Sequence, residues 1–143
     1  MKRIWQWVVV NVMVAVLLGA CSARERSKIQ GSPADPNNLP NIVNTYAVNG
    51  FDPDGVEFGG TVSIRDAGGG EYVIDWIVTG ALLRGRGRIE GNQLLVTWES
   101  MDERQHPVSG TGTYTITDRG ELFGERYLEG NPTPGTENLF PNN

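Results

Sequence analysis

The sequence holds one cysteine and one histidine in 143 residues. A single cysteine cannot form a disulfide within the chain, and a zinc site needs several cysteine, histidine or carboxylate ligands. His106 stands in a polar loop, Met101 to Pro107, without the nucleophile that a Ser-His-Asp or Cys-His grouping requires. We therefore expect no enzyme activity, no cofactor and no bound metal.

Helical periodicity and strong positive charge are also missing. No stretch repeats apolar residues at the spacing of a helix, and the 19 glycines follow no three-residue repeat, which excludes collagen. The formal net charge is −5, and removal of the basic N-terminal residues would make it more negative. An acidic chain has no general attraction for nucleic acid, so we expect no nucleic-acid partner.

Residues 1–20 have the pattern of a secretion signal. Lys2 and Arg3 form a basic start, and residues 4–18 are largely apolar but shorter than the run of about 20 that spans a bilayer. Small residues follow, as they do before a signal cleavage site. We therefore predict that these residues are removed on export.

The end of this signal resembles the bacterial lipobox. It reads Leu18-Gly19-Ala20-Cys21, and in lipoproteins the cysteine of this motif is acylated and becomes the new N-terminus. The resemblance implies that Cys21 is the lipid attachment site and that the membrane is a partner. Ser22 in place of aspartate resembles lipoproteins of the outer membrane. A chance cysteine behind an ordinary signal is the alternative.

The rest of the chain divides into a linker and one domain. Residues 21–41 are polar and contain three prolines, so they bury too little apolar surface to offset their ordering entropy. We predict a lipid-anchored flexible linker over residues 21–41 and a β-barrel domain over residues 42–143.

Short runs that alternate apolar and polar residues fill residues 42–143, separated by turns rich in glycine, asparagine and aspartate. This pattern is typical of an all-β sandwich or barrel. An antiparallel meander of about eight strands favours closure into a small barrel, because closure removes exposed edges, and a β-sandwich is the alternative. We predict strands near residues 44–50, 57–65, 71–78, 81–90, 93–99, 109–117, 121–128 and 136–140.

The turns also predict how the strands pair. A two-residue turn at Gly91-Asn92 places Gly85 opposite Trp98. A turn over residues 65–71 gives three further pairs: Ile64 with Tyr72, Val62 with Ile74, and Gly60 with Trp76. After Arg119-Gly120 two inward-facing sets stay open, either Leu122, Gly124 and Arg126 or Phe123, Glu125 and Tyr127.

These motifs resemble a family of small exported bacterial proteins that repeat Gly/Trp β-hairpins. The resemblance rests on Tyr46-x-Val48-x-Gly50, Gly60-Thr61-Val62-x-Ile64, Tyr72-x-Ile74-x-Trp76, Gly85-x-Gly87, Gly91-Asn92-x-Leu94-x-Val96-x-Trp98 and Gly135-Thr136-Glu137-x-Leu139-x-Pro141. The overall style is similar to avidin-like and lipocalin-like barrels. These motifs specify strands and turns, so the resemblance implies a fold and leaves the activity open.

Arg84, Arg86 and Arg88 form one candidate site, since alternate residues of a strand share a face. Such a stripe can bind the carboxylates, sulfate or phosphate of a ligand or protein partner through forked hydrogen bonds. The alternative is a solvated face paired with Asp75 and Glu99 on neighbouring strands. Because this outward set is polar, we do not expect the barrel to span a membrane.

The sequence thus predicts a non-catalytic, lipid-anchored protein of the cell envelope, with a barrel that binds a ligand or serves as a scaffold. Two alternatives stay open. One is a small barrel-type inhibitor of an exported hydrolase, with Met101 to Val108 as its candidate loop. The other is a carrier of a small apolar ligand, because an eight-stranded barrel can keep a pocket at one mouth.

Overall fold

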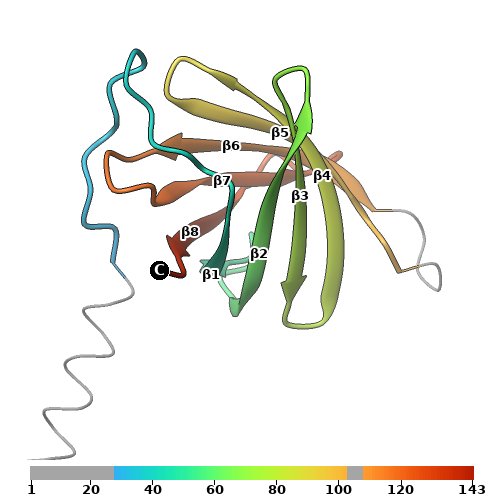
Figure 1. Cartoon of the computed structure of the whole chain (residues 1–143). Coiled ribbons are helices and arrows are strands. Elements are labelled where there is room, and N and C mark those ends of the chain that lie inside the picture. The colour runs from blue at the N-terminus through green and yellow to red at the C-terminus, as the bar shows by residue number, and fades with distance from the viewer. Residues whose placement is uncertain (1–27, 103–107) are drawn as a thin grey trace, which may run out of the picture.

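The fold is a closed barrel of antiparallel strands (Figure 1). The computed structural model describes residues 28–102 and 108–143. Each strand pairs with the next in sequence, and β8 pairs back with β1, which confirms the predicted meander and excludes the sandwich. The strands are β1 (Asn44–Phe51), β2 (Glu57–Gly68), β3 (Glu71–Val78), β4 (Ala81–Glu90), β5 (Gln93–Ser100), β6 (Ser109–Ile116), β7 (Leu122–Leu128) and β8 (Gly135–Pro141).

The core fills the barrel because the strands alternate buried and exposed residues. In β5, Leu94, Val96 and Trp98 are buried. The aromatic residues of neighbouring strands pack in the same interior, where rings supply much of the apolar area. The largest fully buried apolar and aromatic side chains are Trp76, Tyr46, Tyr114, Ile42, Ile64, Ile74, Leu94, Ile116, Leu122, Leu139 and Val62.

The β4–β5 hairpin has the predicted register, with Gly85 opposite Trp98. The register predicted for β2–β3 is wrong by two residues. Val62 lies opposite Trp76, and Gly60 lies opposite Val78. The cause is the turn: β2 continues to Gly68 through a bulge, where the prediction had placed a long loop.

The open question about β7 is resolved in favour of Leu122, Gly124 and Arg126 as the inward-facing set. Leu122 is fully buried, and the side chain of Arg126 is 12 % exposed. Arg126 lies opposite Gly112 of β6, and Gly124 lies opposite Tyr114. A guanidinium therefore enters the barrel interior beside the aromatic residues.

One end of the barrel is closed by the residues that precede β1, drawn in blue and teal in Figure 1. Pro33 forms a β-bridge with Thr117, and Ala34 and Ile42 are buried. The backbone amides of residues 30 and 31 donate to the carboxylate of Glu121, at 2.7–3.2 Å. The flexible linker predicted over residues 21–41 is therefore wrong for residues 30–34, because their amides and apolar side chains find partners on the barrel.

Candidate functional site

The opposite end of the barrel opens into a cavity of about 230 Å³. It lies among the ends of the strands that the β1–β2, β3–β4 and β7–β8 turns connect. Its walls combine apolar and aromatic side chains with a few polar groups, as ligand pockets usually do. The lining residues are Asp52, Pro53, Phe58, Ala81, Leu83, Trp98, Ser100, Val108, Arg126, Leu128, Gly135 and Glu137. We call this space the mouth cavity.

Glu137 of β8 is a buried carboxylate at this cavity, with a side chain that is 0 % exposed. One oxygen, Oε2, accepts hydrogen bonds from Trp76 Nε1 at 3.2 Å and from the Tyr114 hydroxyl at 2.6 Å. Burial, with the Glu137 charge beside it, raises the pKa of Tyr114 well above its usual value. Tyr114 therefore stays protonated and serves as a fixed hydrogen-bond donor.

Arg126 of β7 supplies the balancing positive charge. Its Nε lies 3.0 Å from Glu137 Oε1, and its guanidinium carbon lies 5.2 Å from the centre of the Trp98 ring and 5.5 Å from that of Phe58. Both distances fall within cation–π range. The ion pair is not aligned as a hydrogen bond, which leaves Glu137 Oε1 without a hydrogen-bond partner among the residues that the structure describes. Arg126 Nη1 also has no hydrogen-bond partner among these residues.

Glycines make room for this arrangement. Gly112 lies opposite Arg126, and a Cβ there would lie 2.9 Å from the ring of Tyr114. A Cβ on Gly110 would lie 2.7 Å from the Trp98 ring and 1.8 Å from the Tyr127 carbonyl oxygen. Small residues beside large rings are a recurring way to fill a small barrel. These glycines therefore leave room for the rings of Trp98 and Tyr114 beside the Arg126–Glu137 pair.

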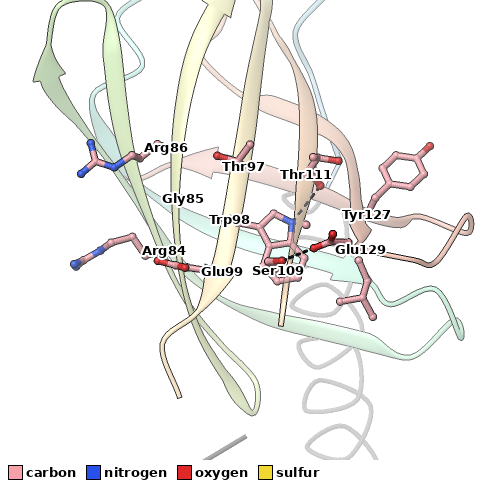
Figure 2. A pocket seen from close by; sticks show the side chains of 12 residues that line it. Arg84, Gly85, Arg86, Thr97, Trp98, Glu99, Ser109, Thr111, Tyr127 and Glu129 are labelled. Carbon is pink, nitrogen blue, oxygen red and sulfur yellow. Dashed lines mark hydrogen bonds between the residues drawn. The ribbon is translucent and has the colours of Figure 1, made fainter. Parts of the chain in front are cut away.

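A second concavity, of about 870 Å³, lies outside the barrel across β4 to β7 (Figure 2). It is larger than the mouth cavity, yet several of its polar groups already have partners. Ser109 donates to Glu129 at 2.8 Å, and the Trp98 indole donates to the Thr111 carbonyl at 3.1 Å. Because these groups are paired, we place the small-molecule site at the mouth cavity and call this outer surface the β4–β7 groove.

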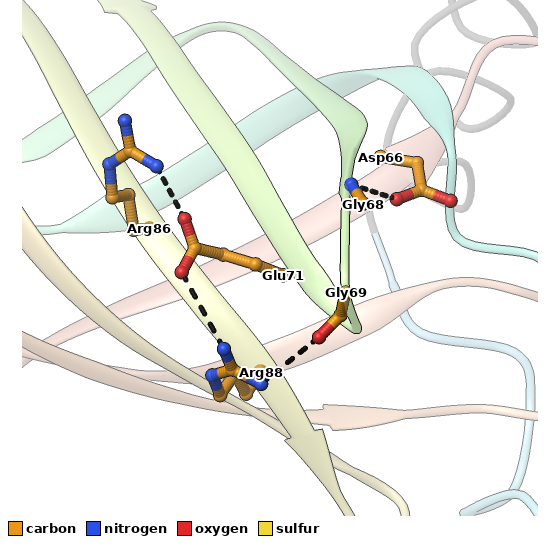
Figure 3. Close-up of polar contacts among 6 residues, drawn as sticks. All are labelled: Asp66, Gly68, Gly69, Glu71, Arg86 and Arg88. Atoms are coloured by element: carbon orange, nitrogen blue, oxygen red, sulfur yellow. Dashed lines mark hydrogen bonds and ion pairs between the residues drawn. The ribbon is translucent and has the colours of Figure 1, made fainter.

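The arginine stripe lies on the outer face, as predicted, and each arginine has a partner. Arg84 Nε lies 2.6 Å from Asp75. Arg86 bonds to Glu71, and Arg88 lies 3.8 Å from the same carboxylate (Figure 3). The hydrogen bond from Arg84 is the largest cause of the lowered pKa of Asp75. Of the predicted pairings with Asp75 and Glu99, the one with Asp75 is confirmed for Arg84, whereas Arg86 and Arg88 pair with Glu71. The three arginine side chains remain 48–66 % exposed.

Several predictions concern residues that the structure does not describe. The signal of residues 1–20, the lipid attachment site Cys21, and residues 103–107 of the predicted inhibitory loop lie outside the described residues. Within the part of the chain that is described, no three metal-ligating side chains cluster. No helix there is long and apolar enough to cross a membrane.

Arg126 and Glu137 are the site residues that sequence analysis did not single out. A signal for Glu137 was present, because alternation along β8 places it on the same face as the apolar Leu139. No family model, curated protein or solved structure matches this chain. The resemblance to small exported bacterial proteins therefore stays a prediction.

Proposed function

We propose that this protein is a lipid-anchored protein of the cell envelope whose barrel binds a small molecule in the mouth cavity without catalysing a reaction. The observation that carries the proposal is the contrast between the two barrel ends. Residues before β1, with Ala34 and Ile42 buried, cover one end, whereas the other opens into a cavity beside the Arg126–Glu137 pair. Pockets at the mouths of barrels are common ligand sites.

The chemistry of the mouth cavity favours binding over catalysis. Glu137 already accepts two hydrogen bonds and faces an arginine, so it does not resemble a general base with a proton to accept from substrate. A carboxylate held in this way positions its neighbours. We infer that the pair fixes the orientation of a ligand while the apolar wall supplies contact area.

The envelope location rests on the sequence of the first 21 residues. Lipid on Cys21, placed outside the cytoplasm by the signal, would hold the barrel at a membrane, with the outer membrane favoured by Ser22. Membrane fractionation of a Cys21→Ala variant tests this anchor. The variant should leave the membrane fraction, and processed variant that stays bound would contradict the lipid attachment.

Native mass spectrometry tests the binding function. The mature protein, purified from its own cell envelope, should carry a small molecule that is lost on denaturation. A matched preparation of the Leu83→Trp variant, in which a larger ring fills the mouth cavity, should carry less of it. A bound mass that is equal in both preparations, or absent from both, would contradict binding in the mouth cavity.

A protein partner at the β4–β7 groove is the second candidate function. The groove is open and bordered by Arg84, Arg86 and Glu129, so it presents both signs of charge to a partner. Such mixed, exposed charge is typical of the polar rim of a transient interface. A barrel-type inhibitor or a scaffold would use this surface. Crosslinking from a reactive group at Thr97 in intact cells would identify such a partner.

A further inference from the structure

The mouth cavity contains a hydrogen-bond donor, on Arg126, for which the described residues provide no acceptor. Arg126 directs Nε toward Glu137, but Nη1 has no acceptor within the described part of the chain. A buried donor without a partner costs about 1–3 kcal/mol, and more when the group is charged. Nη1 itself is buried, but the Arg126 side chain is 12 % exposed and lines the cavity, so an acceptor that inserts beside the guanidinium from the mouth can reach it.

The charge balance favours a neutral acceptor. Arg126 and Glu137 together carry no net charge, and Glu137 is fully buried. A carboxylate or phosphate in the cavity would add an unbalanced negative charge near Glu137 and Asp52. Burying an uncompensated charge is costly, whereas a carbonyl oxygen can accept from the guanidinium and leave the balance unchanged.

Cavity size and the surrounding rim limit the rest of the ligand. About 230 Å³ is below the range of about 300–1,000 Å³ typical of pockets for drug-sized compounds. Phe58 and Trp98 lie beside Arg126, and Leu83 and Leu128 add apolar wall. Most of the exposed large apolar side chains in the described part of the chain also lie at this end: Phe51, Val56, Ile77, Leu82, Met101 and Leu128. A ligand with a short apolar part can therefore contact both the cavity walls and the exposed apolar side chains around the mouth.

We propose that the mouth cavity binds a small, uncharged compound with one carbonyl group, an amide or an ester, whose oxygen accepts a hydrogen bond from Arg126. The guanidinium, which lies within cation–π distance of both Phe58 and Trp98, orients this oxygen. The apolar part of the compound lies against Leu83, Leu128 and the rim. This assignment of ligand class rests on the proposed binding function.

Tryptophan fluorescence gives a local readout. In a chain that starts at residue 22, Trp76 and Trp98 are the two tryptophans that remain, and both contact the Arg126–Glu137 pair. That chain retains every described residue. We would titrate it at neutral pH with hexanamide, hexanoate and toluene, which share an apolar body and differ in the acceptor group.

Hexanamide should half-saturate the signal at a concentration about tenfold below that of hexanoate, which corresponds to about 1.4 kcal/mol. The Arg126→Met/Glu137→Gln variant keeps the site uncharged but lacks the guanidinium, and should lose this preference. The matched control Arg119→Met removes an exposed arginine from the β6–β7 turn at the closed end and should keep it.

Two other results separate the proposals. If toluene and hexanoate bind as well as hexanamide, with or without Arg126, the cavity binds ligands but the carbonyl assignment is overturned. If none of the three compounds changes the fluorescence or gives heat in calorimetry, binding in the mouth cavity is itself overturned. The Arg126–Glu137 pair would then have a structural role alone.

Discussion

At the scale of single residues, Glu137 connects several strands inside the barrel through polar contacts. Its carboxylate connects β8 to Trp76 of β3, Tyr114 of β6 and Arg126 of β7. A buried ion pair contributes little net stability when compared with an apolar replacement, yet removal of one member leaves an uncompensated charge. The pair therefore imposes a specific arrangement at the mouth cavity.

The first prediction concerns this asymmetry. Glu137→Gln should lower the free energy of unfolding by about 3–5 kcal/mol, because Arg126 loses its counter-charge inside the barrel. Adding Arg126→Met should restore at least half of that loss, since no buried charge is then left unpaired. Urea unfolding followed by tryptophan fluorescence measures both values.

Glu90→Gln, at an exposed position on β4, serves as the control and should change stability by less than about 0.5 kcal/mol. A double variant as unstable as Glu137→Gln alone would show that Arg126 is not the source of the cost.

The sequence could not reveal this pair by alternation alone. Both possible inner faces of residues 122–128 contain a charged residue, Arg126 or Glu125, so periodicity gave no decision. The choice depends on Glu137, which approaches Arg126 only when β8 pairs with β7. A charged side chain faces inward where a partner exists, and that partner lies 11 positions further along the chain.

At the scale of elements, turn chemistry decided which hairpin registers were predictable. Gly91-Asn92 is a two-residue turn between strands of matched alternation, so one register was possible and it was confirmed. Before β3, three consecutive glycines, Gly68 to Gly70, all have positive φ and extend the hairpin into a bulged turn. Glycine allows several turn geometries there, and the alternation of β2 fits more than one of them.

The second prediction concerns glycine where strands approach closely. A Cβ on Gly124 would lie 1.9 Å from the Thr113 carbonyl oxygen, which no side-chain adjustment relieves. Gly124→Ala should therefore force β7 away from β6 and lower the free energy of unfolding by about 3 kcal/mol or more. Thermal unfolding followed by circular dichroism provides the measurement.

Gly59→Ala in β2 is the matched control, because its Cβ would meet the Val48 carbonyl oxygen at an ordinary 3.5 Å. That substitution should be neutral or slightly stabilising, through the lower entropy of the unfolded chain. Equal losses in the two variants would mean that close strand approach is not what selects glycine at position 124.

At the scale of the whole molecule, the two ends of the barrel differ in structure: one is covered by the residues before β1, and the other opens into the mouth cavity. The chain enters at the closed end, where Glu121 and Thr117 hold residues 30–34. The mouth cavity and its apolar rim lie at the other end. If Cys21 carries lipid, the anchored segment joins the barrel at the end opposite the ligand site, which leaves the mouth accessible.

Alkaline pH gives the last prediction, because it tests the interior as a whole. Burial raises the pKa of Tyr46 and that of Tyr114. In the unfolded chain both hydroxyls titrate at about pH 10. The folded state keeps its protons above that pH while the unfolded state loses them. The stability tied to these two groups is therefore fully present below about pH 10 and is lost as pH rises further.

The free energy of unfolding should fall by up to about 1.4 kcal/mol per pH unit for each tyrosine. Urea unfolding from neutral to strongly alkaline pH measures this slope. Tyr114→Phe should start less stable, because its hydrogen bond to Glu137 is gone, yet decline less steeply. A slope that this substitution leaves unchanged, or phenolate absorbance from all four tyrosines while the barrel is still folded, would contradict a closed interior around Tyr114.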